Sequence, residues 1–314
     1  MKAIKTTLLL STAFVLFSCG DDTNDYRTPQ GEPTSIVTDA RQRKGPVEAQ
    51  TNLEFPALEQ TSGNEVIVHY CVLNSRTQKN GINYSLEWDH NKKATRWICY
   101  KMYSATNETN WNRNNWANGD PWAYDPDVPQ NEQQATYSEL SSKQNVIPLA
   151  NSDYYEKGHI LASADRLGSK EANEQTYYMT NIYPMVHNFN SGAWLTLEGR
   201  VRTWAKQSDT LYVCKGGTID NSNNILGYTI NGHIVPKYFY MALLSKKGST
   251  LKAIGFLLQH IDPTSWDPIR EYAMNIKELE NKTGLDFFCN LPNDIESQVE
   301  NVDKSQMLKD WSVQ

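Results

Sequence analysis

The sequence predicts an α+β domain in which helices pack on a mainly antiparallel central sheet. Runs rich in β-branched and aromatic residues are separated by turn residues, and the helical patterns do not alternate regularly with them. The expected strands are residues 65–72, 82–88, 96–103, 211–215, 234–244 and 251–259. The expected helices begin near residue 190 and, toward the C-terminus, cover residues 265–279 and 294–302.

The connections between the first strands differ greatly in length from the one that follows them. Lys79-Asn80-Gly81 and Asp89-His90-Asn91 have the residue types of tight turns. Residues Asn107 to Asn145, in contrast, are rich in Asn, Asp, Pro, Trp and Tyr and show no periodicity. This segment is expected to be a long surface loop, and loops of that length often carry function.

The helix near residue 190 carries an apolar stripe at helical spacing, formed by Trp194, Leu197, Val201 and Trp204. The stripe is expected to face the core, with Asn190 or Ser191 as the N-cap. Glu198 lies off the stripe, and because helical side chains lean toward the N-terminus it can point back toward Asn190. Arg202 follows one turn later and fits either an ion pair with Glu198 or a contact to a phosphate.

His159 stands between Gly158, which allows close approach of backbone, and the apolar pair Ile160-Leu161. Taken alone, such a histidine is either structural or catalytic. Together with Asn190 it suits metal-assisted phosphodiester cleavage, because a neutral histidine can activate water while an amide oxygen binds one hard cation such as Mg²⁺.

The segment Glu156-Lys157-Gly158-His159 resembles the D-R-G-H motif of the DNA/RNA non-specific endonucleases, which are ββα-metal nucleases. Three further stretches, Thr180–Pro184, Asn190–Trp194 and Leu197-Glu198, resemble that family in order and spacing. The resemblance is strongest over residues 150–215 and weaker from 65 to 260. It implies the ββα-metal active-site motif and hydrolysis of DNA and RNA, single- or double-stranded.

The resemblance also implies roles for individual residues. His159 would be the general base, Asn190 the direct ligand of Mg²⁺ or Mn²⁺, and Glu198 a group that holds the waters of that cation. Lys157, Asn181 and Arg202 match supporting active-site positions, and Arg96 matches another through a looser alignment. The family includes homodimers, although this sequence marks no interface.

Two departures from the family pattern concern substrate binding. Glu156 and Lys157 replace Asp and Arg, and lysine lacks the planar fork that holds a phosphate with two hydrogen bonds; the proline that the family has after the histidine is replaced near Ala162. Weaker activity or an altered substrate preference is expected. The alternatives are a phosphodiesterase with another substrate, or a catalytically impaired surface lipoprotein that binds nucleic acid or glycans through aromatic residues: Trp111, Trp116 and Trp122.

The N-terminus predicts export and a lipid anchor. Two lysines precede an apolar run at residues 8–17 that is too short to span a bilayer, as in a signal peptide. Leu16-Phe17-Ser18-Cys19 resembles a bacterial lipobox, so residues 1–19 are expected to be a lipoprotein signal peptide, with an ordinary cleaved signal as the alternative. Lipid on Cys19 would attach the protein to the outer membrane of a Gram-negative cell envelope, on either its inner or its outer face. Residues 20–60 predict a disordered acidic tether, and 61–314 the endonuclease domain.

Net charge and cysteine content leave two questions open. The formal net charge of −6 does not exclude a nucleic-acid partner, because a local cationic groove is sufficient for binding. Besides Cys19 the chain has four cysteines, which lack the close spacing of a zinc site and are either paired in disulfides or buried as thiols: Cys71, Cys99, Cys214 and Cys289.

Overall fold

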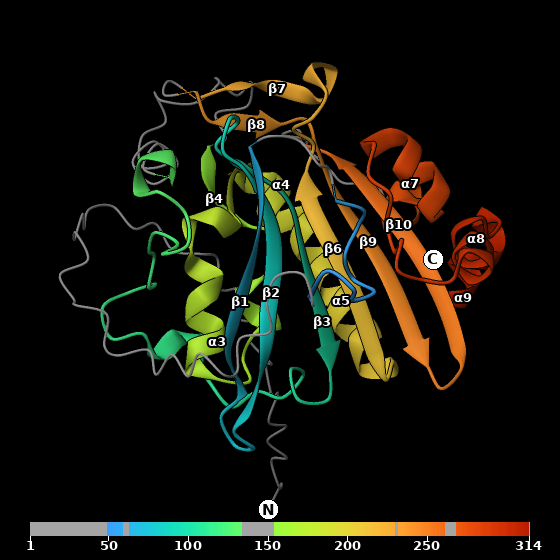
Figure 1. Ribbon diagram of the computed structural model, residues 1–314, viewed down its shortest axis with the longest axis horizontal. Coiled ribbons are helices and arrows are strands. Elements are labelled where there is room, and N and C mark those ends of the chain that lie inside the picture. The colour runs from blue at the N-terminus through green and yellow to red at the C-terminus, as the bar shows by residue number, and fades with distance from the viewer. Residues whose placement is uncertain (1–48, 59–62, 134–153, 230–231, 261–267, 314) are drawn as a thin grey trace, which may run out of the picture. The chain divides into compact units, whose positions relative to one another are not determined.

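The computed structural model describes residues 49–58, 63–133, 154–229, 232–260 and 268–313. Its centre is a seven-stranded sheet in the order β1-β2-β3-β6-β9-β10-β11, in which every neighbouring pair is antiparallel (Figure 1). The strands are β1 (Asn64–Asn74), β2 (Lys79–Asp89), β3 (Ala94–Tyr103), β6 (Thr210–Gly217), β9 (Tyr238–Lys247), β10 (Thr250–Gln259) and β11 (Ala273–Met274). The predicted α+β class with a mainly antiparallel sheet is confirmed.

Both faces of this sheet are covered, as β3 shows. Ile98 and Tyr100 pack in one apolar core, whereas Trp97 and Cys99, which alternate with them, pack in a second core on the other face. The first face is covered by α5 (Leu195–Gln207), whose predicted stripe is buried. The central strands are therefore apolar on both sides.

The ββα unit lies against the first face. Strands β4 (Tyr155–His159) and β5 (Ile182–Val186) pair antiparallel, and the chain then continues through α4 (His187–Phe189) and a π-helical turn (Asn190–Trp194) into α5. The predicted N-cap at Asn190 or Ser191 is wrong, because Asn190 has helical backbone angles (φ −63°, ψ −47°). Gly192 (φ −101°, ψ −106°) kinks the chain there, so that two helical segments run on without a cap. Such π-helical insertions are frequent at functional sites.

The C-terminal region differs from the predicted pattern. The expected helix 265–279 is replaced, within the residues that are described, by α6 (Ile269–Tyr272), strand β11 and α7 (Ile276–Thr283). The break follows from pairing, since Met274 lies opposite Gly255 of β10. The expected helix 294–302 is confirmed as α8 (Asn293–Glu300), and α9 (Lys304–Asp310) follows it.

The expected strand 234–244 is likewise divided in two. Its first part is β8 (Ile234–Pro236), which pairs with β7 (Ile225–Tyr228) outside the main sheet, and its second part is β9. The long segment from residue 107 is described as far as residue 133 and contains one short 3₁₀ helix, η1 (Arg113–Asn115). The rest of that segment lies outside the described residues.

Residues 49–58, which the predicted boundary at residue 60 assigns to the tether, pack against the second face of the sheet. Phe55 is fully buried, and its ring meets Trp97 edge-on at 5.4 Å between centroids. The four cysteines of the domain are free thiols, and Cys71, Cys99 and Cys214 are buried. Among the described residues, no helix is long and apolar enough to cross a membrane.

Candidate active site

His159 is the last residue of β4 and is held from two sides. It lies opposite Ile182 in β5, and its carbonyl oxygen accepts a hydrogen bond from Trp194 Nε1 at 3.2 Å. Gly158 is required by close approach, because a Cβ at this position would lie 2.2 Å from Cγ of Met185. The glycine and tryptophan of the two sequence motifs therefore fix the histidine between a strand pair and a helix.

The imidazole ring of His159 lies between two aromatic rings. The ring centroids of Trp122 and Tyr177 are each 5.1 Å from that of His159. Its Nε2 is buried and has no hydrogen-bond partner among the described residues. Burial, helped by the positive charges of Arg113 and Lys157, lowers the pKa of His159 to about 3. The ring is therefore neutral near pH 7, which is the form that can accept a proton.

Asn190 is oriented by an acidic residue of the first motif. Its Nδ2 donates to Glu156 Oε1 at 2.6 Å, and the other carboxylate oxygen of Glu156 lies 3.1 Å from Nδ1 of His187. Because the amide nitrogen faces Glu156, the carbonyl Oδ1 is turned away from it, and no hydrogen bond among the described residues engages this oxygen. An amide oxygen of this kind is a suitable ligand for a hard cation.

Asn181 lies behind His159 and supports the chain. It is fully buried, its Oδ1 accepts from Leu161 N at 2.8 Å, and its Nδ2 donates to Leu161 O at 2.9 Å and Thr176 O at 2.6 Å. Its own carbonyl accepts from Ile160 N at 3.0 Å. Asn181 is thus a positioning residue for the segment that follows His159.

Glu198 belongs to a buried charge cluster with Asp165, Arg202 and Lys215. Arg202 Nη1 donates to Asp165 Oδ1 at 3.0 Å, and Lys215 Nζ lies 3.6 Å from Asp165 Oδ2. Arg202 therefore pairs with Asp165 and not with Glu198, so the interpretation of Arg202 as the ion-pair partner of Glu198 is wrong. Burial raises the pKa of Glu198 to about 7, against the opposing charges of Lys215 and Arg202.

Sequence reasoning missed three charged residues of this region. Asp165 and Lys215 hold the buried charge cluster together, and both are completely enclosed. Arg113, from η1, lowers the pKa of both His159 and Glu198 through its positive charge. The available signal for Arg113 was its place in the long aromatic-rich segment, whereas no local pattern marked Asp165 or Lys215.

Comparison with known proteins agrees with this geometry. Residues 63–294 match the family model described as DNA/RNA non-specific endonuclease. The chain belongs to the DNA/RNA non-specific endonuclease family. It is 28% identical to a nuclease of Nostoc sp. over 226 residues (69% of this chain, 75% of that protein) and 27% identical to bovine mitochondrial endonuclease G over 154 residues (45% and 52%). A solved EndoG/EndoGI complex aligns with a TM-score of 0.56 at 20% identity, over 79% of this chain and 94% of that one.

These relatives fix the fold and the class of enzyme. The likeness to the solved complex confirms the fold, in which β4, β5 and the following helix form the ββα-metal motif. Family membership makes this protein an endonuclease, a hydrolase of phosphodiester bonds. The chain spans about half the length of bovine endonuclease G and 65% of zebrafish nuclease EXOG.

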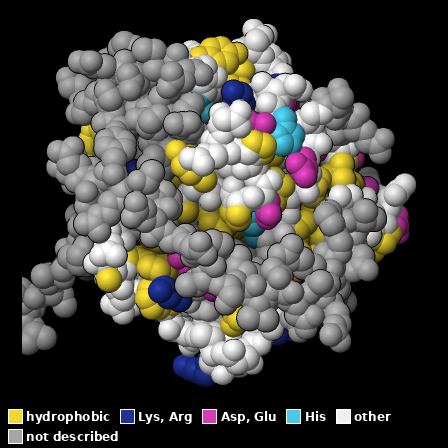
Figure 2. All heavy atoms as spheres, turned by 60° about the vertical axis from the view of Figure 1, so that its left-hand side comes forward, with side chains coloured by type: hydrophobic (Ala, Val, Ile, Leu, Met, Phe, Trp, Pro, Cys, Tyr) yellow, Lys and Arg dark blue, Asp and Glu magenta, His cyan; other side chains and the backbone are white. Residues whose placement is uncertain are grey.

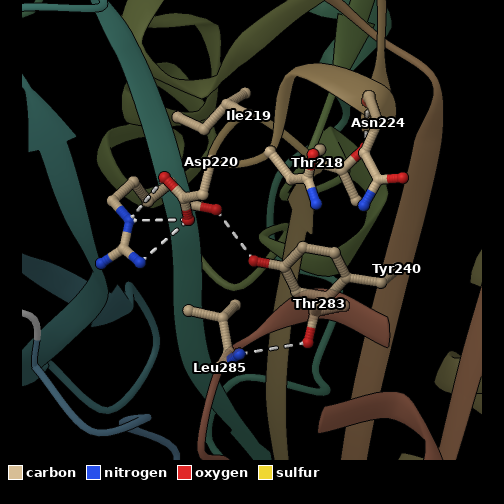
Figure 3. Close-up of a pocket in the computed structure, with 10 residues that line it drawn as sticks. Thr218, Ile219, Asp220, Asn224, Tyr240, Thr283 and Leu285 are labelled. Atoms are coloured by element: carbon tan, nitrogen blue, oxygen red, sulfur yellow. Dashed lines mark hydrogen bonds and ion pairs between the residues drawn. The ribbon is translucent and has the colours of Figure 1, made fainter. Parts of the chain in front are cut away.

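Within this endonuclease, Arg96 occupies a different environment from the group around His159. It is 5% exposed and pairs with Glu87 through Nη1 at 2.5 Å and with Asp220 through Nη2 at 2.9 Å. Together with Asp220 and Tyr240 it lines a small pocket at the end of β6, in which Figure 3 shows Asp220 and Tyr240. The named pocket residues include neither His159 nor Asn190.

A second group of potential ligands lies beside the aromatic-rich segment. His69, Asp125 and Asp127 place ligand atoms within 4.8 Å of one another, so they could hold a metal ion. In this structure Asp125 Oδ2 is engaged by His69 Nε2 at 2.9 Å and by Thr180 Oγ1 at 2.5 Å. These bonds tie the segment that carries Trp122 to β1 and to the residue before Asn181.

The surface around this side of the enzyme is mixed in charge. Figure 2 shows the side on which α3 (Lys170–Glu174) and β4 lie in Figure 1, and there the visible lysine and arginine side chains of the described residues are scattered. The positive charges that bear on the candidate site are thus individual residues close to His159 and Glu198, which fits the net charge of −6.

Proposed function

We propose that this endonuclease hydrolyses DNA and RNA outside the cytoplasm, with His159 as the general base and one Mg²⁺, or Mn²⁺, bound through Asn190. The observation that carries the proposal is the joint placement of the two residues. A neutral, buried histidine and an asparagine oriented by Glu156 stand in one ββα unit, linked by the hydrogen bond from Trp194 to the His159 carbonyl.

The residues of the site have different roles in hydrolysis. Neutral His159 takes a proton from the attacking water, while Arg113 and Lys157 provide positive charge beside it. A Mg²⁺ ion bound at Asn190 would stabilise the charge that develops on the phosphate and the leaving oxygen. The donor set fits such an ion, because Asn190 Oδ1 is unengaged among the described residues and an amide oxygen is a ligand that hard cations accept.

Aromatic and cationic side chains beside His159 support nucleic acid as the substrate. Lys157 Nζ lies 4.7 Å from the centroid of the Trp122 ring, and Lys170 Nζ lies over Trp111 and Trp116 at 5.7 and 5.1 Å. Bases can stack on such rings while the lysines turn toward phosphates. The substitution of Lys157 for the family arginine still leads us to expect a weaker grip on the phosphate.

A cleavage assay tests the proposal. The full chain is incubated with plasmid DNA, single-stranded DNA or RNA, with Mg²⁺ or with a chelator, and compared with His159→Ala and Asn190→Ala. We expect metal-dependent cleavage that each variant loses, whereas Ser191→Ala, an exposed neighbour, keeps it. Binding without cleavage by the wild type, unchanged in His159→Ala, would instead support the impaired binding protein.

The location of the enzyme is a separate part of the proposal. Its support is the lipobox-like segment that ends at Cys19, and these residues lie outside those that the structure describes. We expect the protein to fractionate with the outer membrane and to be digested by protease added to intact cells. The Cys19→Ser variant should lose lipid labelling; retention of the lipid would rule out Cys19 as its attachment point.

A further inference from the structure

Three carboxylates converge at the C-terminal end of the fold, far along the chain from the residues of the proposed site. They are Glu280 in α7, Asp286 in the segment after it, and Glu300, the last residue of α8. One carboxylate oxygen of each lies within 4.8 Å of the other two. Oxygen ligands bind Ca²⁺ at about 2.3–2.6 Å, so two ligands on opposite sides of one ion are separated by about 5 Å. The three groups can therefore reach a single ion.

Glu300 provides the observation that distinguishes this cluster from an ordinary acidic surface. The residue is only 5% exposed, and its Oε1 is buried without a hydrogen-bond partner among the described residues. A buried carboxylate oxygen without a donor is costly unless a cation or a proton satisfies it. Glu300 thus adds a buried carboxylate, one oxygen of which is unsatisfied, to a group of three acids whose ligand oxygens lie within 4.8 Å of one another.

The protein itself compensates this negative charge only in part. Glu280 Oε1 accepts from Phe287 N at 2.9 Å, and Glu280 Oε2 lies 2.9 Å from Nζ of Lys277. Lys277 is 54% exposed, so it can turn away into solvent at little cost. Among the described residues, the cation that pairs with these three carboxylates is Lys277, so the cluster is balanced by one exposed positive charge.

We propose that Glu280, Asp286 and Glu300 form a calcium site that joins α7, the segment after it and α8. Calcium is favoured over magnesium because it accepts an irregular set of carboxylates with backbone and water oxygens completing six to eight ligands, whereas Mg²⁺ demands near-ideal octahedral geometry and retains most of its waters. Asp286 is exposed, so the ion has a path from solvent.

Binding at this site would stabilise the second core. Leu279, Phe287 and Val299, which neighbour the three ligands in sequence, are all buried in the core on the second face of the sheet. One ion would thus tie together three chain segments that now meet through apolar contacts and through hydrogen bonds such as the one from Phe287 N to Glu280. The expected consequence is a rise in thermal stability with calcium, independent of nuclease activity.

The test is a calcium titration of the full chain by calorimetry and by thermal unfolding, with Mg²⁺ kept saturating so that the nuclease site does not report. We expect one calcium ion per chain and a rise of several degrees in Tm. Asp286→Asn and Glu300→Gln should each weaken calcium binding at least tenfold, and Glu278→Gln, an exposed acid of the same helix, should not. Asp286 is exposed, so its variant is expected to fold.

Three results would overturn the proposal: no calcium binding by the wild type, binding that Asp286→Asn and Glu300→Gln leave unchanged, or equal Tm shifts with Mg²⁺ and Ca²⁺ in an Asn190→Ala background. The Asn190→Ala variant also separates this proposal from the catalytic one. It should lose cleavage while it keeps the calcium response, because Asn190 contributes nothing to the acidic cluster.

Discussion

Replacing Glu156 with alanine tests the orientation of the proposed metal ligand most directly. Glu156 accepts the hydrogen bond from Asn190 Nδ2 at 2.6 Å, and the same carboxylate contacts His187 at 3.1 Å. Without this acceptor the Asn190 amide can rotate and present its nitrogen, which cannot bind a cation, where the oxygen now lies. The pairing of His159 with Ile182 in β4 and β5 is backbone geometry and should remain.

The size of the effect follows from the kind of bond that is lost. A hydrogen bond to a charged group contributes about 1.5–3 kcal/mol, and about 1.4 kcal/mol corresponds to a factor of ten. Glu156→Ala should therefore weaken binding of the catalytic cation about 10- to 100-fold, which is also the usual effect of removing a residue that orients a metal ligand. Glu156→Gln keeps an acceptor oxygen without the charge and should show a smaller loss.

The assay is plasmid cleavage at increasing Mg²⁺ concentration, with direct Mn²⁺ binding measured by electron paramagnetic resonance. We expect the half-saturating concentration to rise in Glu156→Ala while cleavage at saturating Mg²⁺ stays within a few-fold of the wild type. Glu271→Ala, an exposed acid of α6, is the control. A variant that titrates like the wild type would refute either the orienting role of Glu156 or the ligand role of Asn190.

Three further predictions concern charges beside the site. Lys157→Met removes a cation that lowers the pKa of His159, so the acid limb of the kcat/KM profile should move to higher pH. Arg113→Ala should slow cleavage at least tenfold at unchanged Tm, as expected when a positive charge beside the reacting phosphate is lost. Burial lowers the pKa of His69, but the charge and hydrogen bond of Asp125 and the charge of Asp127 together outweigh burial, so the net pKa is raised. This pair therefore stabilises the fold fully below about pH 6.5 and loses its effect as pH rises through the folded pKa. Tm should accordingly fall over that range in the wild type and less in His69→Gln.

The central sheet was predictable because its signals are local. Each expected strand of the first half is confirmed within a few residues, since β-branched and aromatic runs bounded by turn residues mark it. The structure of residues 265–279 was not predictable in this way. Strand β11 forms because it pairs with β10, and only the folded chain brings that partner close. Helical periodicity reports which side of a segment is apolar, and it contains no information on an edge strand of two residues.

The buried charge cluster around Glu198 shows that local sequence patterns also fail to predict some contacts within the candidate site. The helix rule for residues four apart gave Glu198 as a partner of Arg202, and such pairs stabilise an isolated helix by only about 0.2–0.5 kcal/mol. In the fold, Asp165 is completely buried and would be costly without a cation, so it takes the bond from Arg202. A weak local preference thus gives way to a strong tertiary requirement that the sequence around residue 198 does not contain.

Arg96 and Arg113 also differ in a way that local sequence patterns do not show. Arg96 follows the strand pattern, and its guanidinium lies between Glu87 and Asp220, so its charge is balanced by two carboxylates within the protein. Breaking a buried pair of this kind costs about 3–5 kcal/mol, so Arg96→Ala should lower the free energy of unfolding by that amount. Arg113 lies in a segment without periodicity and is partly buried, and its charge acts on both His159 and Glu198. A positive charge that reaches the proposed base and its acidic neighbour is the one suited to meet a phosphate between them. The two arginines thus lie in different environments, and we expect Arg113→Ala, rather than Arg96→Ala, to act on cleavage without a large loss of stability.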